Sequence, residues 1–177
     1  MMFWSRCSGF GASVALVAGL VDQLFKAWMI GVLDAAPVQK IVLTPYFDLV
    51  MAWNRGISYG LLRQDGDAGR WLLVAVSLAA IVALVYWLAQ VESRLQALSL
   101  GLIIGGAVGN VVDRIRFGGV ADFFSFHIGS HDWHVFSTEL YFDWYIFNLA
   151  DVAIVAGVAG LLYDSLVASH KSAGKQA

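Results

Sequence analysis

Two aspartates stand in apolar sequence close to long hydrophobic stretches. Asp122 lies in Val-Ala-Asp-Phe-Phe, and Asp151 lies in Phe-Asn-Leu-Ala-Asp, where the last such stretch begins. Two neighbouring carboxylates in a poorly solvated site share a proton, because both cannot ionise comfortably. The ionised member can take a proton from water, and the protonated member can give one to a carbonyl oxygen or a leaving amine. The pair could therefore hydrolyse a peptide bond, whereas a purely structural Asp151 would cap a helix or pair with an arginine.

Further polar residues occur at helical spacing in apolar surroundings. Asn110 and Arg114 are four residues apart, and Asn148 is three residues before the second aspartate. The side-chain amides of the two asparagines could orient the carboxylates or a substrate. The arginine could bind a substrate carbonyl or brace a loop. Asp22 and Lys26 are also four apart, which predicts an ion pair within one helix. For this ion pair a structural role is favoured over direct chemistry.

The elements that carry these residues are predicted to be membrane helices. Of the 177 residues, 59% are hydrophobic and 14% are charged, whereas soluble domains are about one-quarter charged. Four stretches approach the roughly 20 apolar residues that a bilayer requires, at about 11–33, 71–88, 95–112 and 145–167. The first could be a cleaved signal peptide, but apolar sequence continues to Leu33 without a small-x-small cleavage site, so a retained helix is favoured. If the third and fourth helices are antiparallel, both aspartates lie near one end of the bundle.

The whole chain, 1–177, is predicted to be one integral membrane domain. Its longer connections are about 34–70 and 114–144, and the tail 168–177 is expected to be disordered. The first connection is rich in β-branched and aromatic residues, which predicts a small β element. Gly105 and Gly109 form a small-residue face that would let another helix approach closely. Lys and Arg occur on both sides of the predicted bundle, so charge leaves its orientation open.

Two kinds of ligand are not expected. The net charge of −2 gives no indication of a nucleic-acid partner. The segment between the aspartates contains His127, His131, Asp132 and His134, a spacing that invites a zinc interpretation. Gly129 and Ser130 interrupt any helix there, so an aromatic, amphipathic flap over the site is favoured, with no metal.

Four motifs together resemble the lipoprotein signal peptidases, also called signal peptidase II. They are Asp-Gln-Leu-Phe-Lys at 22–26, Asn-Arg-Gly-Ile-Ser-Tyr-Gly at 54–60, Gly-Gly-Ala-Val-Gly-Asn-Val-Val-Asp-Arg at 105–114 with Val-Ala-Asp-Phe at 120–123, and Phe-Asn-Leu-Ala-Asp at 147–151. The motifs occur in the family's order on the expected four-helix pattern. Ser58-Tyr59 stands where the family often has Ala-Phe, and the segment 124–145 looks longer than usual.

The resemblance implies an all-α membrane protein with four transmembrane helices and a small periplasmic β element after the first helix. It implies an aspartic endopeptidase that removes signal peptides from diacylglyceryl-modified prolipoproteins, cutting just before the lipidated cysteine, with Asp122 and Asp151 as the catalytic pair. The implied active-site support comprises Asn54, Asn110, Arg114, Asn148, Asp22, Lys26 and Asp113. The enzyme would lie in the bacterial inner membrane as a monomer without a cofactor, its termini cytoplasmic and its site near the periplasmic face.

Two other classes of protein are weighed against this expectation. A small transporter or proton-relay subunit would also bury aspartates, but it predicts inverted repeats or paired discontinuous helices, and neither is visible. A purely structural membrane protein would leave the polar cluster unexplained.

Overall fold

The computed structural model describes residues 4–34, 40–56, 67–128 and 145–173. It also describes three two-residue segments, 134–135, 138–139 and 142–143. Its four helices are α1 (Ser8–Asp34), α2 (Asp67–Leu88), α3 (Arg94–Phe117) and α4 (Leu149–Ala173). By length and composition each of these helices can cross a membrane. The prediction of four membrane helices is therefore confirmed, and the chain is a multi-pass membrane protein.

The helix ends differ from the predicted ones. Helix α3 continues past residue 112 to Phe117 and stops at Gly118, which adopts the left-handed conformation at φ 76° that favours glycine. Helix α4 begins at Leu149 instead of residue 145, because the preceding Phe147 pairs with Phe124 as an isolated β-bridge. Helix α4 extends to Ala173 and so includes part of the tail 168–177, whose disorder stays a prediction.

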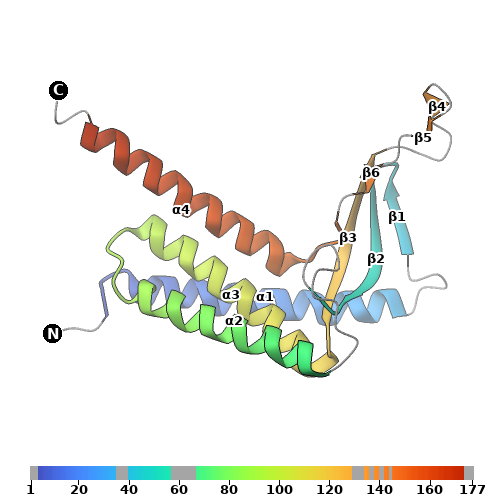
Figure 1. The fold of residues 1–177 in the computed structure, drawn as a ribbon, viewed down its shortest axis with the longest axis horizontal. Helices are drawn as coiled ribbons and strands as arrows, with labels where there is room; N and C mark the ends of the chain where they lie inside the picture. The colour runs from blue at the N-terminus through green and yellow to red at the C-terminus, as the bar shows by residue number, and fades with distance from the viewer. Residues whose placement is uncertain are drawn as a thin grey trace.

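Successive helices run in opposite directions, and α3 lies at the centre of the bundle (Figure 1). Glycines allow its neighbours to approach. A Cβ atom on Gly105 would lie 2.5 Å from the carbonyl oxygen of Ala15 in α1, and one on Gly106 would lie 2.5 Å from the carbonyl oxygen of Ala150 in α4. Because real Cβ atoms do not approach backbone so closely, these contacts need glycine. The predicted close packing at Gly105 is confirmed.

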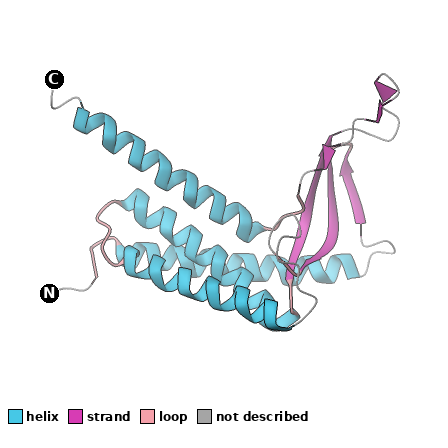
Figure 2. Cartoon of the chain, in the orientation of Figure 1, coloured by secondary structure: helices cyan, strands magenta, loops and turns pink. Residues whose placement is uncertain are grey.

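A small antiparallel sheet stands at one end of the bundle, and both termini lie at the other end (Figures 1 and 2). Its order is β1 (Lys40–Thr44), β2 (Phe47–Asn54), β3 (Val120–Ile128) and β6 (Phe142–Asp143), with β4 (His134–Val135) and β5 (Thr138–Glu139) forming a separate pair. The predicted β element after the first helix is confirmed by β1 and β2. Strand β3, which follows α3 and pairs with β2, was not predicted.

Strand β3 places apolar and acidic side chains on opposite faces. Ala121 and Phe123 are buried against Met29 and Leu33 of α1. Since successive strand residues alternate in direction, Asp122 points to the other face. Asn54 of β2 shares that face, because Ala52 pairs with Asp122 and Asn54 pairs with Val120 in the register of the two strands.

Candidate active site

Asp122 is a buried carboxyl group held by two amides. Its Oδ1 accepts a hydrogen bond from Nδ2 of Asn148 at 2.7 Å, and the Asn54 side chain also hydrogen-bonds to it. The side chain is 2% exposed. Burial raises the pKa of Asp122 to about 7, and the negative charge of Asp151 acts in the same direction, while the two amides and Lys26 oppose the rise. A group with this pKa can hold or release a proton at neutral pH.

Asp151 lies in the first turn of α4 and uses its two oxygens differently. Asn148 caps the helix reciprocally: its Oδ1 accepts from the Asp151 backbone N–H at 3.0 Å, and its own N–H donates to Oδ2 of Asp151 at 3.1 Å. The other oxygen, Oδ1, accepts from Nδ2 of Asn110 at 3.0 Å. Capping thus occupies one carboxylate oxygen only, and the second is tied to α3.

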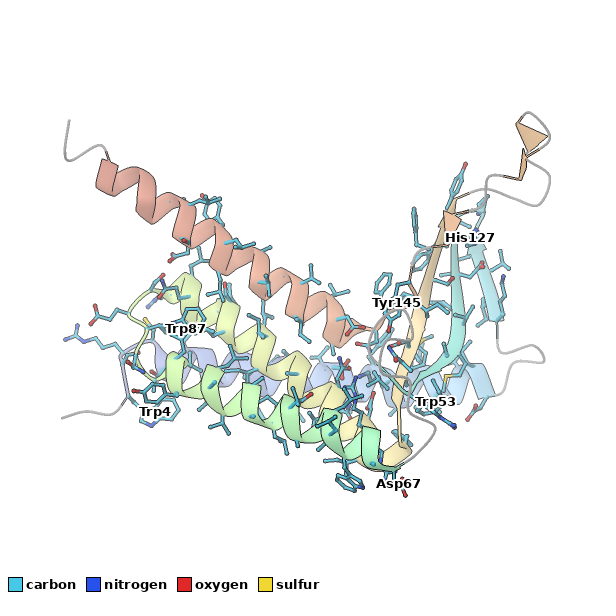
Figure 3. All side chains as sticks on the ribbon, viewed as in Figure 1. Trp4, Trp53, Asp67, Trp87, His127 and Tyr145 are labelled. Atoms are coloured by element: carbon cyan, nitrogen blue, oxygen red, sulfur yellow. The ribbon has the colours of Figure 1, made fainter. Side chains whose placement is uncertain are left out.

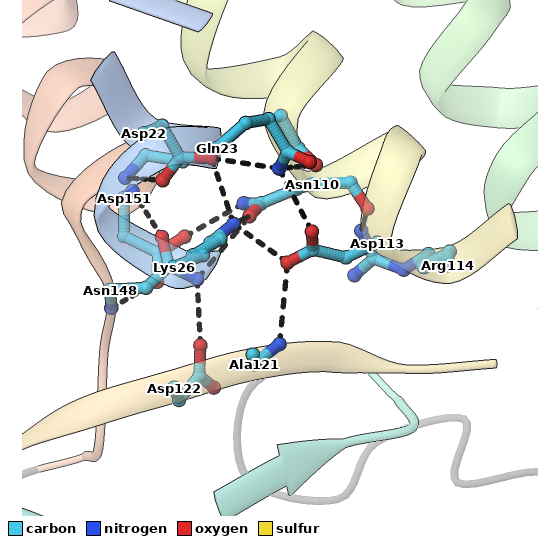
Figure 4. Close-up of polar contacts among 12 residues, drawn as sticks. Asp22, Gln23, Lys26, Asn110, Asp113, Arg114, Ala121, Asp122, Asn148 and Asp151 are labelled. Atoms are coloured by element: carbon cyan, nitrogen blue, oxygen red, sulfur yellow. Dashed lines mark hydrogen bonds and ion pairs between the residues drawn. The ribbon is translucent and has the colours of Figure 1, made fainter. Parts of the chain in front are cut away.

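Two asparagines connect the carboxylates (Figure 4). Nδ2 of Asn148 reaches both Asp122 and, at 3.3 Å, Oδ1 of Asn110. Nδ2 of Asn110 in turn donates to Asp151. The predicted pair is therefore joined through neutral amide groups that come from α3 and from the start of α4.

A buried group of charges lies behind this pair. Nζ of Lys26 is 3.0 Å from Oδ2 of Asp22 and 2.8 Å from Oδ2 of Asp113, and it donates to Oδ1 of Asn110 at 3.1 Å. The predicted ion pair between Asp22 and Lys26 is present, and Asp113 is a second carboxylate partner. Gly109 leaves the room for this arrangement, since a Cβ there would collide with the Asp22 carboxylate.

Backbone donors and Gln23 complete the group of charges. Oδ1 of Asp22 accepts from the backbone N–H of Ala150, which is one of the unpaired donors at the start of α4. Nε2 of Gln23 donates to Oδ1 of Asp113 at 2.9 Å. The charged group thus fixes α1, α3 and the first turn of α4 relative to one another.

A pocket of about 650 Å³ opens in front of the two aspartates. One side is polar and includes Asn54, Asn110 and Arg114 together with the aspartates, and the other is formed by apolar residues of α4 from Val152 to Ala159. Nη1 of Arg114 donates to the backbone carbonyl of Asn110 at 3.3 Å. Its Nε is buried and has no hydrogen-bond partner within the described part of the chain. Arg114 lines the pocket, so its guanidinium group lies beside the space that a ligand would occupy.

All the predicted site residues gather at the sheet end of the bundle, and sequence reasoning missed some of their neighbours. Tyr145, Gln23 and Gly56 had no assigned role, yet the first and last line the pocket and Gln23 holds Asp113. Gln23 stands inside a recognised motif, which could have drawn attention to it. No sequence signal pointed to Tyr145.

The histidine-rich segment is described only in part. Nε2 of His127 lies 3.0 Å from Oδ2 of Asp48, which also pairs with Lys40. Figure 3 shows His127 toward the far end of the sheet from the bundle, away from Tyr145. His131, Asp132 and the side chain of His134 fall outside the described residues, as do Ser58 and Tyr59.

A family model described as Signal peptidase (SPase) II matches residues 14–167. The chain belongs to this family. It is 49% identical over 154 residues to a lipoprotein signal peptidase of Methylorubrum extorquens, covering 86% of this chain and 84% of the relative. It is 48% identical over 155 residues to the lipoprotein signal peptidase of Nitrobacter hamburgensis, covering 87% and 90%.

The fold is shared with a solved bacterial membrane enzyme. A structure determined by the in meso method at 2.3 Å covers 91% of this chain and 90% of its own, with a TM-score of 0.70 and 22% identity. At this identity the likeness concerns the fold alone. Membership of the signal peptidase II family makes the chain a protease, and the proton-relay alternative has no support.

Proposed function

We propose that the chain removes signal peptides from diacylglyceryl-modified prolipoproteins as an aspartic endopeptidase, cutting just before the lipidated cysteine. The observation that carries this proposal is the pair Asp122 and Asp151, joined by asparagines at the edge of a pocket with an apolar wall. Relatives named lipoprotein signal peptidase that cover most of the chain supply the substrate class.

In the proposed reaction the two aspartates share one proton. Asp122, whose pKa is raised to about 7, holds the proton, and Asp151, which accepts two N–H donors, is ionised. Asp151 takes a proton from water as the water oxygen bonds to the scissile carbonyl carbon, and Asp122 gives its proton to the carbonyl oxygen. Asp151 then protonates the amide nitrogen, the carbon–nitrogen bond breaks, and Asp122 recovers a proton from a hydroxyl of the intermediate.

The pocket could hold the substrate peptide beside the two aspartates. The guanidinium group of Arg114, which lines the pocket, can donate to a substrate carbonyl, which would position the peptide next to the aspartates. The apolar wall of α4 suits the small apolar side chains of a signal peptide that remains in the bilayer. No metal or organic cofactor takes part in these steps.

The test is cleavage of a lipidated prolipoprotein by purified protein in lipid nanodiscs. Asp122→Asn and Asp151→Asn should each lower kcat at least about 100-fold, because each removes a proton-transfer group. Asp164→Asn is the matched control, since Asp164 lies at the other end of α4 and hydrogen-bonds Ser93 and Gln96. Normal cleavage by a folded Asp122→Asn or Asp151→Asn variant would disprove the assignment of these aspartates as the catalytic pair. No cleavage by the unsubstituted protein would disprove the proposed activity.

We also propose that the chain lies in the bacterial inner membrane with cytoplasmic termini, the sheet and site at the periplasmic face, and acts as a monomer. Both termini lie opposite the sheet (Figure 1), and the described part of one chain brings all the predicted site residues together. In a Cys7→Ser background, Lys40→Cys on β1 should react with a membrane-impermeant maleimide in spheroplasts, whereas Gln90→Cys in the turn between α2 and α3 should react only after lysis. The reverse pattern would contradict the orientation.

A further inference from the structure

Tyr145 touches the site from a segment to which the proposed reaction assigns no role. It precedes α4, lines the pocket, and lies where the start of α4 meets the sheet (Figure 3). Its phenol oxygen accepts a hydrogen bond from Nδ2 of Asn54, a residue at the end of β2. The tyrosine thus connects the entry of the last helix with a strand that precedes it by about half the chain.

Asn54 has its amide fully engaged. Its Oδ1 accepts from the backbone N–H of Gly56 at 3.1 Å, which defines which end of the amide is the donor end. Its Nδ2 has two hydrogens, and the partners of this end are Tyr145 and Asp122. With three partners the amide has a single orientation, and that orientation directs an N–H at the Asp122 carboxyl group.

We propose that Tyr145 is a positioning residue for the aspartate pair: its phenol oxygen fixes the Asn54 amide so that the amide donates to Asp122. This inference rests on the proposed function for its kinetic consequences, but the contacts that carry it lie within the protein itself. Tyr145 acts through Asn54 and takes no part in proton transfer. Without the hydroxyl, Nδ2 of Asn54 loses one of its anchors and the amide can turn away from the carboxyl group.

The consequence for Asp122 has a definite sign. The Asn54 hydrogen bond lowers the pKa of Asp122, so a weaker bond lets that pKa rise further above 7. The charged groups that face Asp122 are Asp151 from α4, Lys26 from α1 and Arg114 from α3. Tyr145 also interacts electrostatically with Arg114, so the part of the shift that passes through Asn54 is identified by repeating the substitution in an Asn54→Ala background.

The experiment compares Tyr145→Phe with the unsubstituted enzyme across pH. The variant keeps the ring, so packing is preserved. We expect kcat to fall roughly three- to tenfold, the effect of one hydrogen bond, with little change in KM. The limb of the pH profile that reports Asp122 should move up by about half a pH unit. Tyr163→Phe is the matched control, because Tyr163 is exposed on the outer surface of α4, and it should change neither quantity.

A double-mutant cycle tests whether the effect passes through Asn54. In an Asn54→Ala background, Tyr145→Phe should cause no further shift of the pH limb. An equal shift with or without Asn54, or a loss of kcat with an unmoved limb, would overturn the proposal.

A second readout separates this proposal from the proposed function. The titration of the Asp122 carboxyl group can be followed by infrared difference spectroscopy, with Asp122→Asn identifying its band, whether or not a substrate is cleaved. An upward shift in Tyr145→Phe supports the positioning role even if the unsubstituted protein cleaves no prolipoprotein. An unchanged Asp122 titration overturns it even if cleavage is normal.

Discussion

Removing the cation from the buried group behind the site should strongly destabilise the protein. Lys26 is 3% exposed and lies 3.0 Å from one carboxylate oxygen of Asp22 and 2.8 Å from one of Asp113. At such distances and an effective dielectric constant of about 20, each contact contributes roughly 5 to 6 kcal/mol of Coulomb attraction before desolvation is subtracted. Lys26→Met leaves two buried carboxylates without their cation. We expect a loss of about 3–5 kcal/mol of unfolding free energy, the cost of breaking a buried pair.

The informative comparison is with a variant in which all three charges are removed together. The triple variant Lys26→Met, Asp22→Asn and Asp113→Asn keeps similar volumes and leaves no unpaired charge. It should lie within about 2 kcal/mol of the unsubstituted protein, because buried ion pairs gain little over neutral replacements. Unfolding free energies in lipid bicelles, measured by steric trapping, provide the assay for both variants.

Two results would refute this reasoning. If Lys26→Met alone costs less than about 1 kcal/mol, Lys26 does not neutralise the two carboxylates in the folded protein. If the triple variant is as unstable as the single one, the loss comes from packing of the lysine side chain and not from its charge.

Three further predictions concern groups around the same site. Folding raises the pKa of Asp122 from about 4 to about 7, so the stability that this group contributes is fully present below pH 4 and is lost as pH rises through 7. Asp122→Asn should therefore be up to about 4 kcal/mol more stable than the unsubstituted protein at pH 8 and no more stable at pH 4. Unfolding free energies measured at both pH values check this. Gly109→Ala, whose methyl group would collide with the Asp22 carboxylate, should cost about 1–3 kcal/mol in the steric-trapping assay, whereas Gly31→Ala, with nothing within 4 Å, should be nearly neutral. Asn148→Ala should lower kcat about tenfold or more and move the Asp122 limb to higher pH, because it removes the 2.7 Å donor to that carboxyl group and the cap of α4; an unmoved limb would contradict this.

The membrane helices could be predicted because their signal is local. About 20 consecutive apolar residues are enough to identify a span, whatever the rest of the chain does. The ends were less predictable. Asp113, Arg114 and Arg116 made the third helix look finished at residue 112, but Asp113 is paired inside the bundle and the left-handed Gly118 ends the helix five residues later. A charged residue in the sequence therefore does not mark the end of a membrane helix when a buried partner neutralises it.

The sheet shows the opposite case. Strand β3 pairs with β2 across more than 60 residues. Alternation along β3 turns Asp122 away from the Phe123 side, and the register with β2 puts it on the same face as Asn54. Alternation along β3 is a local property, but the choice of partner strand depends on where α3 ends and how it packs on α1. This pairing could not be obtained from one strand's sequence.

The sequence by itself determined that the chain lies in a membrane and which chemical groups it carries there. Its four apolar helices have carboxyl and amide groups near their ends, where burial makes these groups reactive. Tertiary structure decided the connections. It gave Lys26 a second carboxylate, Asp113, and gave Asn54 the phenol of Tyr145. The physical reason is that hydrogen bonds and ion pairs between distant segments require positions within about an ångström, which only the packing of helices and the register of strands can fix.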